Sequence, residues 1–263
     1  MTKQSPKSML LFADFVASTT GFARVAREIA QLFNRKGWEV DQLAINAMYN
    51  ESANIPYLRY WRGIESPHLK NSGDVYGLQS GVLIHALNGL SGSSGGFKKH
   101  YDVLFFLQDL FVFQAYASDI RRVKEAQKKA GFEPMKVVYY CPIDGHFMPE
   151  WLSNMDVVDV LIPFSEYGKT QALDDCSRFL AMCGQNLEFV SKRPDQEDPR
   201  IKERTAAIYN DMEQLKKAYE KFENCKPVYH GTNTNQFFPL SDSKSSEARA
   251  ALFGMLFGCS FVF

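Results

Sequence analysis

The chain has 263 residues, of which 45% are hydrophobic and 14% aromatic, and its 30 Lys and Arg residues balance its 30 Asp and Glu residues. That apolar content is ample for a large core, so a disordered chain is not the default expectation. The formal net charge of zero removes any composition-level argument for non-specific nucleic-acid binding or for a polybasic membrane patch.

Short apolar runs alternate with amphipathic stretches along the first part of the chain. The first run, Ser8 to Ala13, is followed by a polar loop from Asp14 to Thr20. A helix is predicted from Gly21 to about Arg35, because its apolar residues recur at helical spacing. A second strand is predicted over Trp38 to Ile45, and residues 47–77 are expected to be mostly loop, with a short strand near Val75 and Tyr76. The alternation predicts βαβ units and a mainly parallel sheet.

The middle of the chain continues this alternation. A helix is predicted over Gln79 to Leu87, and a buried strand over Tyr101 to Leu107, which is apolar on both faces as parallel sheets require. A further helix is predicted around Ala117 to Ala130, and a strand over Met135 to Tyr140. These elements extend the same α/β pattern.

The last part of the chain departs from the pattern. A strand is predicted over Val157 to Ile162 and a helix from near Glu166, but Leu187 to Glu223 is highly charged. Six apolar residues place a long amphipathic helix within that stretch: Ile201, Ala206, Ile208, Met212, Leu215 and Tyr219. Lys226 to Tyr229 is predicted to return as a short strand.

Cysteine usage and hydropathy bear on the cellular compartment. The five cysteines form no CxxC pair: Cys141, Cys176, Cys183, Cys225 and Cys259. A zinc site or a disulfide scaffold is therefore not expected, and a reducing compartment is favoured. No run of eighteen apolar residues occurs, and the N-terminal MTKQSPKS lacks the apolar core of a signal peptide. We expect a soluble cytoplasmic protein without a transmembrane segment.

Small residues gather at the predicted start of the first helix. Ser18, Thr19, Thr20 and Gly21 occupy this turn, where free backbone N–H groups and the helix dipole favour an anion such as phosphate. The spacing matches neither GxGxxG nor the P-loop pattern, so neither a dinucleotide fold nor a P-loop ATPase is indicated. The alternative is that these residues are ordinary helix caps.

The segment CPIDGHFMPEW follows a buried strand. Asp144 and His146 should therefore lie at the carboxyl end of that strand, where open α/β sheets bind ligands. A carboxylate and an imidazole could position a hydroxyl group or assist proton transfer there. The alternative is a simple turn, because Pro-x-Asp-Gly is good turn chemistry.

Polar residues also follow two other predicted strands. Ser165, with Glu166 after it, is an N-cap candidate that also faces the predicted cleft. Gln108 and Asp109 end the strand YDVLFFLQD and either line the cleft or face solvent. No nucleophile elbow and no HExxH pattern occurs, so hydrolase and metalloprotease functions are not favoured.

Taken together, these segments resemble the N-terminal half of a family 4-type glycosyltransferase of the GT-B fold. They come in the family's order: STTGFARVAREIAQLFNRKGWEV, YDVLFF, VVYYCPIDGHFMPEW, VDVLIPFSEYGKTQAL and VYHGTNTNQFFPL. The last segment is similar to the family's His-Gly-Val-Asp-x-x-x-Phe-x-Pro. His230, Gly231, Phe237 or Phe238, and Pro239 match it, whereas Thr232 and Asn233 stand where Val and Asp are usual.

The resemblance implies a retaining transferase that moves a sugar from a nucleotide-diphosphate donor to an acceptor, without a bound metal or other cofactor. Asp144 is the nearest match to the residue that faces the reacting sugar, with His146 second. Gln108 and Asp109 would lie on the acceptor side. The residues implied near the donor diphosphate or in the cleft are Thr20, Gly21, Phe22, Ser165, His230 and Gly231. Such a site must stabilise an oxocarbenium-like centre and a departing diphosphate.

The resemblance also implies a domain organisation. Residues 1–238 would form a Rossmann-like acceptor-side domain, with a parallel sheet, flanking helices and a charged helical insertion at about 187–223. Residues 239–263 would be the linker and the truncated start of a nucleotide-binding domain. The chain is therefore expected to be mostly the acceptor half, to need a complementing C-terminal domain, and to bind nucleotide sugars weakly by itself.

Two other functions stay open at this stage. One is a non-catalytic Rossmann-like binding module that docks through its charged helix, and the other is a nucleotide-sugar epimerase of the same GT-B architecture. The residues predict neither the donor sugar nor the acceptor.

Overall fold

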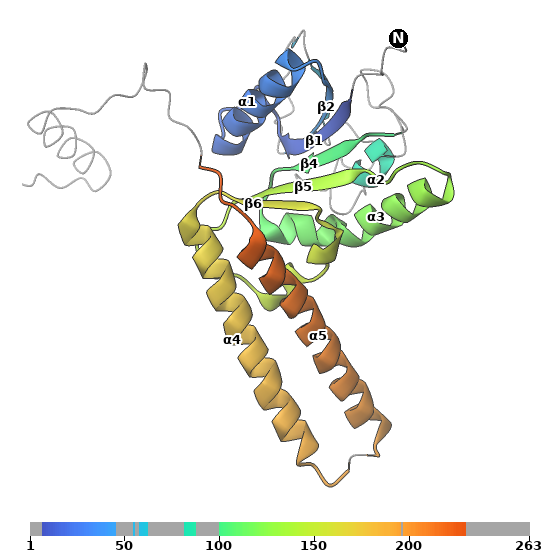
Figure 1. Cartoon of the computed structure of the whole chain (residues 1–263), viewed down its shortest axis with the longest axis vertical. Helices are drawn as coiled ribbons and strands as arrows, with labels where there is room; N and C mark the ends of the chain where they lie inside the picture. The colour runs from blue at the N-terminus through green and yellow to red at the C-terminus, as the bar shows by residue number, and fades with distance from the viewer. Residues whose placement is uncertain are drawn as a thin grey trace, which may run out of the picture. The chain divides into compact units, whose positions relative to one another are not determined.

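A computed structural model describes residues 7–45, 55, 58–62, 82–87, 100–195 and 197–229 (Figure 1). The chain divides into two units, Met1–Tyr229 and His230–Phe263, and every described residue belongs to the first. The domain boundary predicted at residue 238 lies outside the described residues.

The described part of the chain forms a six-stranded sheet in the order β3-β2-β1-β4-β5-β6, in which every neighbouring pair is parallel. The strands are β1 (Ser8–Asp14), β2 (Glu39–Ile45), β3 (Arg59–Arg62), β4 (Val103–Phe106), β5 (Lys136–Cys141) and β6 (Val160–Pro163). The helices are α1 (Gly21–Arg35), α2 (Val82–Leu87), α3 (Leu110–Lys129), α4 (Glu166–Ser191) and α5 (Pro199–Asn224). Two short 3-10 helices, η2 (Pro149–Leu152) and η3 (Met155–Val157), precede β6. The predicted Rossmann-like α/β class is confirmed.

Both faces of the sheet are apolar, which is why its strands read as continuous hydrophobic runs. In β1 every residue is buried, and because successive side chains point to opposite faces, alternate residues belong to different cores. Leu10 and Phe12 join the core beneath α3, whereas Met9 and Leu11 join the core beneath α1. Figure 1 shows α1 and α3 on opposite sides of the sheet.

Aromatic rings fill the core on the α3 side. The rings of Phe12 and Phe106, on the neighbouring strands β1 and β4, stack with centroids 4.3 Å apart. Phe113 of α3 stacks on Tyr139 of β5 at the same distance and meets Phe106 edge-on at 5.1 Å. Each buried ring of this kind stabilises the fold by about 1.5–3 kcal/mol through its removal from water. These contacts fix β1, β4 and β5 against α3.

Three predictions of secondary structure were wrong. Helix α3 begins at Leu110 rather than near residue 117, because its first turns are buried on nearly all sides and show no helical period. Strand β3 lies in a segment predicted as loop. Lys226 to Tyr229 is not a strand, since only one of its backbone groups, the N–H of Val228, pairs with the edge strand, at the carbonyl of Pro163.

Helices α4 and α5 form an antiparallel hairpin that extends beyond the sheet (Figure 1). Along α5, seven buried or half-buried positions follow spacings of four and three, the repeat of a coiled coil: 201, 205, 208, 212, 215, 219 and 222. Positions 214, 218 and 221, near the base of the helix, are also buried or half-buried, so the buried face is wider there. The repeat corrects the predicted apolar face at one position, because Ala206 is exposed.

The hairpin has two cores. Leu215 and Phe222, near the base of α5, belong to the main core, whereas Val190, Ile201 and Ile208 form a separate small core farther out. Helix α4 runs through Leu187, so the charged stretch that begins there continues an existing helix rather than starting a new element.

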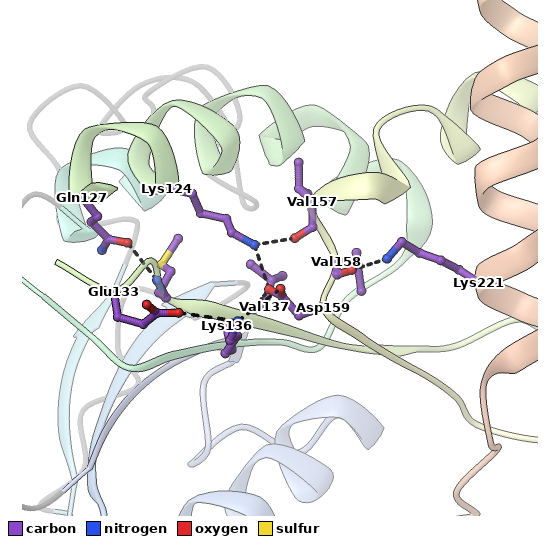
Figure 2. Close-up of polar contacts among 10 residues, drawn as sticks. Lys124, Gln127, Glu133, Lys136, Val137, Val157, Val158, Asp159 and Lys221 are labelled. Atoms are coloured by element: carbon purple, nitrogen blue, oxygen red, sulfur yellow. Dashed lines mark hydrogen bonds and ion pairs between the residues drawn. The ribbon is translucent and has the colours of Figure 1, made fainter. Parts of the chain in front are cut away.

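A polar cluster joins the hairpin base to the amino ends of β5 and β6 (Figure 2). The carboxylate of Asp159 accepts from Lys124 Nζ of α3 at 2.8 Å and from the backbone N–H of Val137 at 2.7 Å. Lys221 of α5 donates to the carbonyl of Val158. Helices α3 and α5 are thereby tied to the sheet at the end opposite the carboxyl ends of the strands.

The coiled-coil repeat predicts different effects for two neighbouring residues of α5. Ile208→Ala should lower the free energy of unfolding, or of local opening of the hairpin, by about 2 kcal/mol through loss of buried methyl groups. Tyr209→Ala, whose side chain is 58% exposed, should change it by at most about 0.5 kcal/mol. Urea unfolding with amide hydrogen exchange measures both, and equal losses in the two variants would contradict the proposed register.

Candidate functional site

The order of the strands reverses direction between β1 and β4. The chain runs outward from β1 to β3, returns to β4 and then runs outward to β6. The loops that follow β1 and β4 therefore leave the sheet on opposite sides, and open α/β sheets bind ligands in the crevice between such loops. Thr20 and Gln108, predicted from the sequence, lie on these two loops.

A buried carboxylate links the two loops at this point. Asp14, at the end of β1, is 1% exposed. Its Oδ2 accepts a hydrogen bond from Thr20 Oγ1 at 2.6 Å, and its Oδ1 accepts one from Gln108 Nε2 at 2.7 Å. The same Thr20 oxygen accepts the Ala23 N–H at 3.0 Å and so caps α1. Thr20 and Gln108 are thus brought together, but the side chains of both residues hydrogen-bond to Asp14.

Gln42 supports the loop after β1 from the neighbouring strand. Its side chain is fully buried. Gln42 Nε2 donates to the Asp14 carbonyl at 2.7 Å, and its Oε1 accepts the Val16 N–H at 3.3 Å. The available signal for Asp14 was a carboxylate at the end of an apolar strand, whereas Gln42 stands in a strand that also contains Glu39 and Asp41. Sequence reasoning missed both as site residues.

Gly21 and Phe22 open helix α1 and differ in surroundings. Gly21 is exposed, and a Cβ added there would meet no atom of the described residues within 4 Å. Phe22 instead packs edge-on against Phe164, after β6, with ring centroids 6.4 Å apart, and Phe164 packs on Tyr140 at 4.2 Å. Gly21 therefore leaves room for a ligand at the start of α1, whereas Phe22 contributes packing.

Asp109 follows β4 and Asp144 follows β5, and the two carboxyl groups interact electrostatically. Asp109 precedes α3 and is half-buried, but its side chain does not cap that helix. Burial raises the pKa of Asp109, and the negative charges of Asp144 and Asp14 raise this pKa further. Asp144 itself is exposed. A carboxyl group with a raised pKa in a crevice is suited to proton transfer.

His146 is held by helix α4 and not by Asp144. Its Nδ1 lies 2.8 Å from Asp175 Oδ1 and 2.7 Å from Gln171 Nε2. Asp175 is 1% exposed, and it also accepts the Phe147 N–H at 3.2 Å and Arg178 Nη2 at 2.7 Å. Asp175 was not predicted, because nothing in its local sequence signals a contact with a residue 29 positions earlier.

Ser165 lies at the amino end of α4, as predicted, and its Oγ accepts the Gly168 N–H at 3.0 Å. A Cβ added at Gly168 would lie 2.8 Å from the carbonyl oxygen of Ile143, so this glycine permits close approach of α4 to the loop after β5. Tyr229 also reaches this corner, where its hydroxyl accepts the Glu166 N–H at 3.0 Å.

The last described residues run along the carboxyl edge of the sheet. The Val228 N–H donates to the carbonyl of Pro163 at 3.0 Å, and the Tyr140 hydroxyl donates to the Val228 carbonyl at 2.7 Å. His230 and Gly231, which follow, lie outside the described residues. Their predicted role in the cleft therefore stays a prediction.

Comparison with known proteins identifies no family for this chain. A scan against protein-family models found no match, and no curated protein matches it. None of the helices in the described ranges combines the length and apolarity needed to cross a bilayer. Within those same residues, no cluster of three His, Cys, Asp or Glu side chains could hold a metal ion.

Asp109 predicts a pH-dependent contribution to stability. Because its pKa in the folded chain lies above the ordinary value of 3.8, the stability that it contributes is present below that pH and is lost as pH rises through the folded-state pKa. Asp109→Asn removes this loss, so the variant should gain stability relative to wild type between about pH 4 and pH 7. Urea unfolding across this range measures the difference. Asp144→Asn should shrink the effect, and a difference that does not change with pH would contradict it.

Gly168 and Gly21 form a matched pair for testing the packing of this edge. Gly168→Ala places a methyl group against a backbone carbonyl and should destabilise the fold by about 1–3 kcal/mol. Gly21→Ala, with open space around it, should change stability by at most about 0.5 kcal/mol. Thermal or urea unfolding of the two variants decides the point, and the reverse order would rule out the close approach of α4 to Ile143.

Proposed function

We propose that this chain carries the acceptor-side domain of a GT-B glycosyltransferase, which holds an acceptor while a sugar is transferred from a nucleotide diphosphate. The observation that carries the proposal is the set of polar side chains at the carboxyl edge of the sheet, where the strand order reverses. They come from the ends of four strands: Asp14 at the end of β1, Asp109 after β4, Asp144 and His146 after β5, and Ser165 after β6. The order of the resembling segments supports the same proposal.

The groups left open at the crevice suit a carbohydrate ligand. Asp14 accepts hydrogen bonds from both Thr20 and Gln108, and these bonds hold one wall of the proposed site in place. Asp109 and Asp144 carry carboxylates that can accept hydrogen bonds from sugar hydroxyl groups. Asp109, with its raised pKa, is a candidate to accept or return a proton. Gly21 leaves open space at the start of α1, and the amino end of a helix favours an anion such as a diphosphate.

The proposal predicts which residues respond to bound sugars and nucleotide sugars. Chemical-shift mapping of the 15N-labelled chain with millimolar hexoses, oligosaccharides, UDP-glucose and GDP-mannose should perturb amides at residues 15–22, 107–112, 142–146 and 163–168. We expect the carbohydrate effects to exceed the nucleotide effects, because this is the acceptor side. Perturbations confined to the outer half of the hairpin would favour a non-catalytic binding module, and none with any sugar would contradict the proposal.

A matched pair of variants sharpens this experiment. Gly21→Leu fills the space in front of α1 and should abolish or strongly reduce the perturbations at residues 15–22 while leaving the fold intact. Tyr209→Ala, on the hairpin, should leave them unchanged. If Gly21→Leu retains full ligand-induced shifts in this loop, the start of α1 is not part of the site.

A further inference from the structure

His146 has two partners at the same ring nitrogen, and they make opposite demands. Asp175 Oδ1, 2.8 Å from Nδ1, can only accept a hydrogen bond, so it requires a proton on Nδ1. Gln171 Nε2, 2.7 Å from the same nitrogen, can only donate, so it requires an unprotonated Nδ1. In the neutral ring, both demands cannot be met together.

The chemistry of the two partners decides between these demands. A glutamine side chain carries an acceptor and a donor on one planar group, so half a turn of the amide presents Oε1 of Gln171 in place of Nε2. A carboxylate offers only acceptors, and turning Asp175 changes nothing. An unprotonated Nδ1 would leave two lone pairs facing each other at a carboxylate that is 1% exposed, which is costly at a buried charge.

Further hydrogen bonds hold Asp175 in place, so that it determines which nitrogen of His146 carries the proton. Its Oδ2 accepts the backbone N–H of Phe147, which is the residue after His146, and its Oδ1 also accepts Arg178 Nη2. The carboxylate therefore contacts both the ring of His146 and the backbone that carries that ring. In the described part of the chain, His146 Nε2 makes no hydrogen bond, and the side chain is 67% exposed.

We propose that Asp175 is the positioning residue of His146: it holds the imidazole with the proton on Nδ1 and leaves Nε2 as a bare hydrogen-bond acceptor beside the carboxyl end of β5. The use of this nitrogen rests on the proposed function: it would accept a hydrogen bond from a hydroxyl group of the bound carbohydrate. The orientation of the ring itself follows from Asp175 whether or not the chain acts on a sugar.

The tautomer of His146 tests this directly in the full chain. Long-range 1H–15N spectra distinguish a protonated from an unprotonated ring nitrogen, and the signals lost in His146→Gln assign the ring among the chain's five histidines. Above the pH at which the ring takes up its second proton, wild type should show a protonated Nδ1 and an unprotonated Nε2. Gln171→Leu should keep this pattern, whereas Asp175→Leu, which removes the acceptor altogether, should shift the ring to a mixture of tautomers or to Nε2–H.

Each outcome bears on the proposal. A wild-type ring with its proton on Nε2 overturns it, and this holds even if Asp175→Leu fails to fold. An unchanged tautomer in folded Asp175→Leu also overturns it, as does loss of the pattern in Gln171→Leu alone. The result is separable from the proposed function, because absence of ligand-induced shifts with any sugar would leave the tautomer measurement unaffected.

Discussion

The buried carboxylate of Asp14 is the constraint on which the arrangement of the crevice depends. A carboxylate removed from water must be supplied with hydrogen-bond donors, since its desolvation is otherwise uncompensated. The donors here are Thr20, six residues later, and Gln108, 94 residues later. One charge therefore holds the start of α1 and the end of β4 together where the strand order reverses. Gln42 adds a third strand by binding the backbone on both sides of the same turn.

This constraint divides the polar residues of the edge into two groups. Asp14, Thr20, Gln108 and Ser165 use their side chains on the protein itself, as hydrogen-bond partners or helix caps. Asp109, Asp144 and His146 are partly or largely exposed. A rigid wall with open functional groups is what a binding site requires, since groups already positioned lose little freedom on binding. The base of α5 is tied to the opposite end of the sheet by Lys221, which donates to the Val158 carbonyl, whereas α4 begins at the carboxyl edge itself, where Ser165 caps it.

The sequence predicted the layers of the fold better than its polar contacts. Strands β1, β4 and β5 were visible because a sheet covered on both faces produces long apolar runs, and β2 was predicted although Asp41 and Gln42 interrupt its apolar residues. The carboxyl-end positions of Asp109, Asp144, His146 and Ser165 followed from the strands alone. The start of α3 was missed, since a helix turn buried on every side has no periodicity, and so was β3, whose four residues include two arginines.

The residues that organise the site were missed for a different reason. Asp14 and Gln42 act through contacts across the sheet, and Asp175 acts through a contact between α4 and the loop after β5. Such pairings depend on strand order and helix placement, which local propensity does not specify. A carboxylate at the end of an apolar strand was the only local sign of Asp14, whereas Gln42, in a strand with two other polar residues, and Asp175 had no such sign.

The most direct test of the account is the amide hydrogen exchange of the two loops in Asp14→Ala compared with wild type. If the buried carboxylate joins them, exchange should rise together at residues 15–22 and 107–112, while the outer half of the hairpin is unaffected. Unchanged exchange in both loops, or a rise at residues 15–22 alone, would show that Asp14 does not hold the crevice together.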